Sequence, residues 1–229
     1  MKNIRKNNFF SQDYYESILK KAIDSKYTFV TFRSFFKDLK KKRKKIAILR
    51  HDIDQKISRT KIFHEVEDSM KIKSTNFLLI HDVNYNCFDL NTLSLFLNAE
   101  KKGHEIGLHT NFVETSKILN LKPDLTLKKE LLMIRNYFKV TGVACHRNID
   151  YLYNSLPYLQ KNWKRISKEN NLLYDAYGHN LMSNNVFINE STNHLGWRNH
   201  TPEDIIESGK NFILSTHPHW WHKEHPFED

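Results

Sequence analysis

The chain has 229 residues, of which 39% are hydrophobic and 13% aromatic, so it contains enough apolar side chains to form a packed core. This composition excludes wholesale disorder, and the length fits one large α/β domain or two small ones. The formal net charge of +10 and the pI near 9.4 favour an anionic partner such as nucleic acid, an acidic membrane surface or a phosphorylated substrate.

The two cysteines and the N-terminal segment indicate the cellular compartment in which we expect the protein. Cys87 and Cys145 are too few for a disulfide framework and lie in no CxxC pair, so we expect free thiols in a reducing compartment. The N-terminal segment is basic but lacks the apolar core of a secretion signal. No apolar run approaches the roughly 20 residues that cross a bilayer. These features predict a cytoplasmic protein, peripheral to the membrane at most.

The first 45 residues predict a helix, a strand and a basic segment. Ser11 can cap a helix that runs to about Lys26, and the short strand YTFVTF follows it. The basic run at 40–45 cannot be buried, so we expect a solvated turn or helix end, or a contact for a phosphate group. We expect residues 1–45 to pack on a barrel formed by residues 46–229.

From residue 46 onward, predicted strands and helices alternate. The strands are IAIL, STNFLLI, HEIGLH, GVACH, LLYDA, VFIN and NFILST. The helices begin at Ser58, span about 90–102, 125–137 and 156–169, and follow an N-cap at Thr201. This βαβα rhythm predicts a parallel α/β sheet closed as a barrel.

Polar clusters follow five of these strands directly: RHDID, LHT, CHRN, YDA and THPHWW. In parallel α/β folds the carboxyl ends of the strands form the reactive mouth. Five such clusters at one rim predict an enzyme.

The first cluster brings two carboxylates together. Asp52 and Asp54 are two residues apart, so in an extended segment they share a face. Two carboxylates this close repel each other unless a metal, an arginine or a proton lies between them. Arg50 alternates onto the same face, so an arginine-held structural ion cluster is one alternative.

The stretch GHEIGLHT offers one histidine to this mouth. His104 and His109 are five residues apart, whereas the zinc-binding HExxH helix requires four. On a strand the two rings point to opposite sides, so we assign His109, at the strand end, to the site and His104 to a structural role.

These groups are suited to hydrolysis. A carboxylate from Asp54 and an imidazole from His109 suit a borderline divalent ion such as zinc. Asp52 could then take a proton from the attacking water, and His217 could donate one to the leaving group. Together they predict cleavage of an amide or an ester.

The ordered motifs RHDID, GHEIGLHT, ACHRN and STHPHWW resemble those of the NodB-like polysaccharide deacetylases, carbohydrate esterase family four. The likeness is greatest to a variant branch with an RHDxD first motif that accompanies surface-polysaccharide and lipopolysaccharide genes, and it runs from about Ile46 to Trp221. It implies a NodB homology domain, a distorted (β/α) barrel with about seven parallel strands. The implied activity is metal-dependent removal of an N-acetyl or related acyl group from a sugar in a nucleotide-linked or lipid-linked glycan. Zinc is the expected metal, with nickel or cobalt as alternatives.

The resemblance also implies residue roles. Asp52 matches the catalytic base, Asp54 the metal-binding aspartate and His217 the general acid. His109 matches the first histidine of the H-[ST]-x-x-H motif, and Arg147 lies where the family often places an arginine against the base.

Aromatic and acidic residues near the motifs are assigned to substrate binding or to the orientation of the general acid. Asp175 and Trp197 are candidates for orienting His217 and for the substrate site. Trp220 or Trp221 is expected to form a sugar-stacking platform or a core lid.

Two departures from the family pattern leave the function open. Val113 stands where the family has its second metal-binding histidine, and the proline-bearing third motif is replaced by CHRNID. His146, Asn111 or Glu114 could complete the metal shell, and we favour His146. An alternative is therefore a catalytically degenerate barrel that binds carbohydrate or assists assembly. Nucleic-acid binding has no supporting motif and is the least favoured hypothesis.

Overall fold

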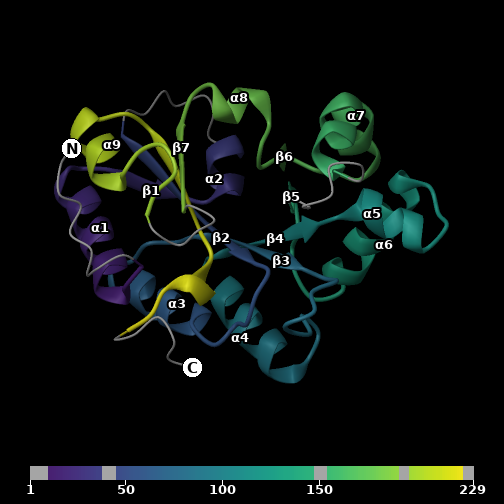
Figure 1. Ribbon diagram of the computed structural model, residues 1–229, viewed down its shortest axis with the longest axis horizontal. Helices are drawn as coiled ribbons and strands as arrows, with labels where there is room; N and C mark the ends of the chain where they lie inside the picture. Colours follow the sequence, from purple (N-terminus) through teal and green to yellow (C-terminus); the bar gives the residue numbers. More distant parts are fainter. Residues whose placement is uncertain (1–9, 38–44, 147–153, 191–195, 224–229) are drawn as a thin grey trace.

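The computed structural model describes residues 10–37, 45–146, 154–190 and 196–223. In this part of the chain, seven parallel strands follow one another in the order β6-β5-β4-β3-β2-β8-β7 and curl into an open barrel (Figure 1). The predicted distorted (β/α) barrel is thereby confirmed. The strands are β2 (Ile46–Ile53), β3 (Thr75–Leu79), β4 (Glu105–Thr110), β5 (Gly142–Cys145), β6 (Tyr174–Asp175), β7 (Val186–Asn189) and β8 (Phe212–Thr216).

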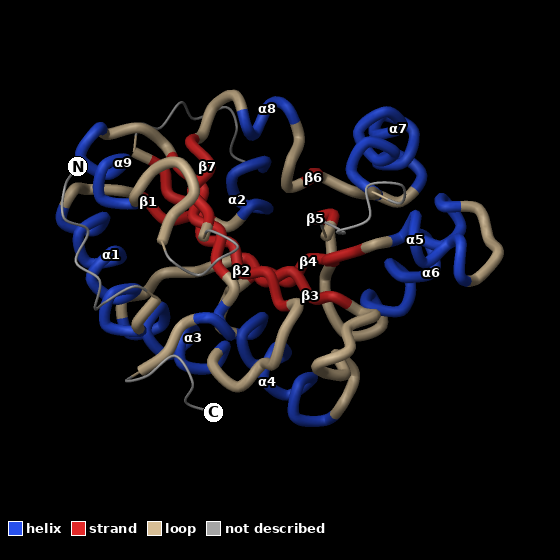
Figure 2. The backbone as a smooth tube through the Cα atoms, viewed as in Figure 1, coloured by secondary structure: helices blue, strands red, loops and turns tan. Residues whose placement is uncertain are grey.

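Helices surround the sheet on its outer side (Figure 2). The longer ones are α1 (Gln12–Asp24), α3 (Thr60–Ser69), α4 (Leu90–Lys101), α6 (Pro123–Arg135) and α7 (Ser155–Glu169), and the shorter ones are α5 (Phe112–Ile118) and α9 (Pro202–Ser208). The longest of these described helices, α7, has 15 residues, and none is long and apolar enough to cross a membrane.

Strand β2 is the centre of the sheet. The short strand β1 (Thr28–Val30) pairs with its first half, β3 pairs with its second half, and β8 pairs along its other edge. All residues of β2 are buried, including three that carry charged or imidazole groups. Strand β1 thus shares the sheet of the barrel strands, and the boundary at residues 45 and 46 stays a prediction.

The amino-terminal end of the barrel is closed by helix α2 (Phe32–Lys37). Phe32 stacks on Tyr174 with ring centroids 5.1 Å apart and meets Phe77 edge-on at 5.6 Å. Strand β5 approaches the same ring so closely that a Cβ on Gly142 would lie 2.0 Å from Tyr174. Only glycine fits there, because any side chain would force the ring out of the core.

The predicted helix caps agree with the structure at both ends of the chain. Ser11 accepts a hydrogen bond from the Tyr14 amide at 3.1 Å, and Thr201 accepts one from the Asp204 amide at 3.2 Å. The predicted start at Ser58 is wrong, because Arg59 precedes the first residue of α3. Helices α2, α5 and α8 (His179–Met182) were not predicted, since one or two turns give no 3.6-residue pattern.

Candidate active site

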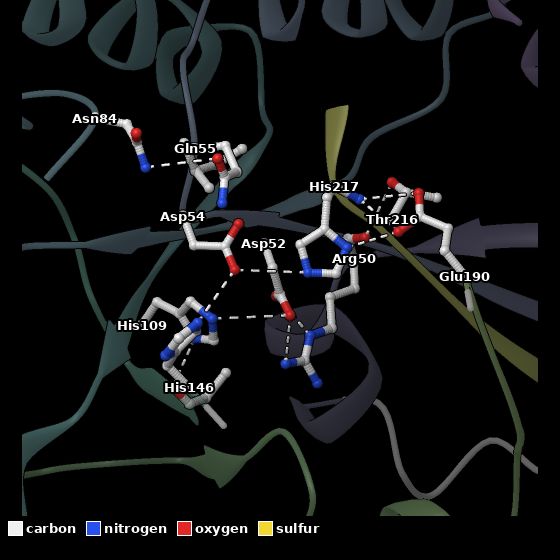
Figure 3. A network of polar contacts seen from close by, with 12 residues as sticks. Arg50, Asp52, Asp54, Gln55, Asn84, His109, His146, Glu190, Thr216 and His217 are labelled. Carbon is white, nitrogen blue, oxygen red and sulfur yellow. Dashed lines mark hydrogen bonds and ion pairs between the residues drawn. The ribbon is translucent and has the colours of Figure 1, made fainter. Parts of the chain in front are cut away.

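Polar side chains at the ends of four strands of the sheet, β2, β4, β5 and β8, meet at the carboxyl end of the barrel (Figure 3). Asp52 is the penultimate residue of β2, and Asp54 follows that strand directly. His109 lies near the end of β4, His146 follows β5, and His217 follows β8. They lie together because parallel strands end at the same rim.

The end of β2 is held by a tyrosine from the next loop. The hydroxyl of Tyr85 donates to the carbonyl of Ile53 at 2.7 Å and accepts from the amide of Leu79 at 3.0 Å. This joins the ends of β2 and β3 and fixes the chain one residue before Asp54.

Asp54, His109 and His146 form a group that could hold a metal ion. One ligand atom from each lies within 4.8 Å of the others. Oδ1 of Asp54 is buried and has no hydrogen-bond partner among the described residues, as a carboxylate oxygen reserved for a cation would be. One oxygen and two imidazole nitrogens suit zinc and similar divalent ions, so the residues present fit such an ion.

The two histidines of this group are oriented by different partners. Nδ1 of His109 donates to the carbonyl of Ala144 at 2.9 Å, which leaves Nε2 with its lone pair toward the cluster. Burial lowers the pKa of His109 to about 4, so the ring stays neutral, as a ligand must. The side-chain amide of Asn111 lies 3.1 Å from Nδ1 of His146.

Val113 lies on α5 and packs against the apolar core beneath α6 and α7. Its amide donates to the hydroxyl of Ser155 at 3.0 Å. The second imidazole of the cluster comes from His146, on a different strand end, rather than from a residue four positions after His109.

Asp52 is paired with an arginine from its own strand. Nε and Nη2 of Arg50 donate to its two oxygens at 2.7 and 2.8 Å. Arg50 is fully buried, lies 4.4 Å from the Tyr177 ring centroid and also donates to the Tyr177 hydroxyl. Burial opposes ionisation of Asp52, but the guanidinium outweighs it and holds the pKa of that carboxyl well below its usual range. Asp52 is therefore ionised, and its Oδ2 lies 3.9 Å from Nε2 of His109.

His217 is paired with a carboxylate that the motif analysis did not single out. Nδ1 lies 2.6 Å from Oε2 of Glu190, at the end of β7, and the His217 amide donates to both carboxylate oxygens. Burial alone would lower the pKa of His217, but Glu190 reverses the shift and raises it to about 9. The ring is therefore an imidazolium at neutral pH, with Nε2 3.6 Å from Oδ2 of Asp54.

The sequence contains a signal that places Glu190 at the same rim. The residue follows the predicted strand VFIN directly, as the other polar clusters follow theirs. Strand β7 pairs with β8, so its end lies beside His217.

The remaining predicted residues lie at different distances from this centre. Trp220 stacks on His217 with ring centroids 4.0 Å apart. Trp197 donates to the hydroxyl of Tyr14 at 3.1 Å. It is linked to His217 only indirectly, through Trp221, whose Nε1 donates to Glu190 at 2.5 Å.

Asp175 does not contact His217, contrary to the expectation that it orients that ring. It accepts from the Tyr177 amide at 3.0 Å, and burial raises its pKa to about 6. The carboxylate on His217 is Glu190 instead, because β6 lies at the far edge of the sheet from β7 and β8. Arg147 lies outside the described residues.

No protein-family model matches this sequence, and no curated protein matches it. Among solved structures, the chain is similar to a Streptococcus pyogenes deacetylase, PplD, in complex with acetate. The two chains are 15% identical, the match covers 86% of each, and the TM-score is 0.55. At this level of identity the likeness concerns the fold.

Proposed function

We propose that this chain is a metal-dependent hydrolase that removes an N-acetyl or related acyl group from a sugar. The observation that carries the proposal is the pairing of an ionised carboxylate with a protonated imidazole beside a candidate metal group. Asp52 is kept ionised by Arg50, and His217 is kept protonated by Glu190. The similarity of the fold to that of an acetate-bound deacetylase supports the same reaction class.

The two groups have complementary tasks in amide hydrolysis. Asp52 accepts the proton of the water whose oxygen forms the new bond to the acyl carbon. His217 donates its Nε2 proton to the amine nitrogen as the carbon–nitrogen bond breaks, so the products are a carboxylate and a free amine. Asp54, His109 and His146 would hold a divalent ion, which supplies positive charge against the oxygen that becomes negative.

The substrate is proposed to be an acetylated sugar of a nucleotide-linked or lipid-linked glycan in surface-polysaccharide or lipopolysaccharide biosynthesis. Trp220 supports this class, because it is a half-buried indole beside His217, and a flat amphipathic ring of this kind is suited to stacking on a sugar. The metal is proposed to be zinc, with nickel and cobalt as alternatives.

The test is acetate release from N-acetylglucosamine oligosaccharides and from UDP-N-acetylglucosamine by zinc-loaded protein. We expect Asp52→Asn to lower the rate by about 10²- to 10⁴-fold, the usual contribution of a positioned base. Glu65→Gln is the control, because that side chain is exposed on α3. Full activity in the Asp52→Asn variant would falsify the role of Asp52.

Val113 favours a second candidate, a barrel that kept its fold and binds carbohydrate without cleaving it. Elemental analysis separates the two. Protein that takes up no zinc, nickel or cobalt and releases no acetate after their addition would support the binding protein.

A further inference from the structure

Helices α5 and α6 form a hairpin at the edge of the molecule opposite α1 (Figure 1). Large apolar side chains are exposed along it, including Ile118 at 79% and Leu132 at 57%. We define the hairpin surface as the exposed apolar residues Ile118, Leu119, Leu125, Leu132 and Met133 together with the exposed lysines Lys117, Lys122, Lys128 and Lys129.

The pattern on α6 is that of an amphipathic helix with a second apolar stripe. Leu127, Leu131 and Ile134 are buried against the sheet. Leu125, Lys129 and Leu132 fall within about 60° of one another on the opposite side. Leucines that do not contribute to the core therefore lie between lysines on the solvent-exposed side of α6.

The charge of the hairpin surface is positive. Residues 117–133 contain only two acidic side chains, Asp124 and Glu130. Asp124 is paired with Arg165 at 2.9 Å, and Glu130 is buried on the inner side of α6. None of the four lysines forms an ion pair with another described residue.

The loop between β3 and α4 contacts both the hairpin, through His81 and Glu130 of α6, and the mouth of the candidate site. Phe88 of this loop lies 5.5 Å from the ring of Tyr137, just beyond α6. Val83 of the same loop is 97% exposed. Its neighbour Asn84 approaches Gln55, the residue after Asp54, at 3.5 Å.

We propose that the hairpin surface docks on an anionic lipid bilayer, with the mouth of the site close to the lipid headgroups. Exposed leucine and isoleucine side chains can enter the boundary between headgroups and acyl chains, while lysines beside them meet lipid phosphates. A nucleic acid would use the lysines but not the apolar side chains. A second copy docking face to face would bring the lysines of both copies together, which disfavours a two-fold dimer.

The test is co-sedimentation of the full chain with vesicles of phosphatidylcholine alone or mixed with phosphatidylglycerol. We expect binding to the mixed vesicles only, weakened by salt. Ile118→Ser/Leu132→Ser and, separately, Lys128→Gln/Lys129→Gln are each expected to lower the partition coefficient by about tenfold or more. All of these side chains are exposed, and circular dichroism and thermal unfolding check that the fold is retained.

Two matched controls lie on the opposite edge of the molecule. Lys20→Gln/Lys26→Gln removes the same charge from the α1 region, and Ile23→Ser removes an exposed apolar side chain from α1. Both are expected to bind vesicles as the unchanged protein does.

Three outcomes would overturn the proposal. They are no binding to the mixed vesicles, equal weakening by the Lys20/Lys26 control pair, and undiminished binding after both hairpin changes. Concentration-dependent dimerisation that Leu132→Ser abolishes, without vesicle binding, would assign the surface to a second copy. Vesicle binding is measured without any substrate, so its failure is distinguishable from failure of the proposed hydrolase activity.

Discussion

Glu190 binds His217 through both the ring and the backbone, with Oε2 2.6 Å from Nδ1 and both carboxylate oxygens accepting from the same amide (Figure 3). The carboxylate thus fixes the orientation of the imidazole and its charge together. It directly follows β7, the strand next to the one that precedes His217.

Replacing Glu190 by Gln is expected to bring the pKa of His217 from about 9 back toward its ordinary value of 6.5. The raised pKa implies stability that is fully present below about pH 6.5 and lost as the pH rises through about 9. The loss of stability in the variant should therefore be greatest in the lower part of this window. NMR titration of the His217 ring measures the change in its pKa, and urea unfolding between about pH 6.5 and 9 measures the change in stability. Glu207→Gln, at an exposed site on α9, is the control, and an unchanged His217 titration in Glu190→Gln contradicts the assignment.

Replacing Arg50 by Met is expected to cost about 3–5 kcal/mol of stability, because it leaves the Asp52 carboxylate buried and unpaired. The double change Arg50→Met/Asp52→Leu removes both charges and should recover most of that loss. Urea unfolding at neutral pH measures the difference. A double variant as unstable as the single one would show that the ion pair itself is not the cause.

Zinc is expected to bind stoichiometrically and to raise the unfolding temperature of the protein. Asp54→Ala and His146→Ala should each lower the affinity by more than about a hundredfold, since loss of an outer-shell partner alone costs about 10- to 100-fold. Competition with a chromogenic chelator gives the affinity, and His200→Ala at an exposed site is the control. Affinity unchanged in His146→Ala would remove that residue from the ligand set.

Replacing Glu67 by Ala is expected to destabilise the fold by about 3–5 kcal/mol, because Glu67 is a buried acceptor on the outer side of the sheet. Its carboxylate accepts from Tyr15 at 2.5 Å and Ser74 at 2.7 Å, and it lies 2.6 Å from Nε2 of His51. Glu65→Ala on the same helix should change stability by less than about 1 kcal/mol, because that side chain is exposed. Similar unfolding midpoints for the two variants would contradict this account.

Local patterns in the sequence were sufficient to predict the barrel and the location of its mouth. The strand predictions depended on apolar runs, and the caps at Ser11 and Thr201 on residue type and spacing. The short helix α5 was missed because its 7 residues mix polar and apolar side chains without a clear period. Its position matters, because it begins after Asn111 and turns Val113 into the core.

The sequence by itself determined that Asp52, Asp54, His109 and His217 lie at one rim, because each follows or ends an apolar strand and parallel strands end on the same side. Only the tertiary structure decided which side chains touch. The order of strands in the sheet placed Glu190 rather than Asp175 on His217, and it brought the His146 imidazole to Asp54. Such pairings depend on contacts between residues far apart in the chain, and the spacing within a motif carries no information about them.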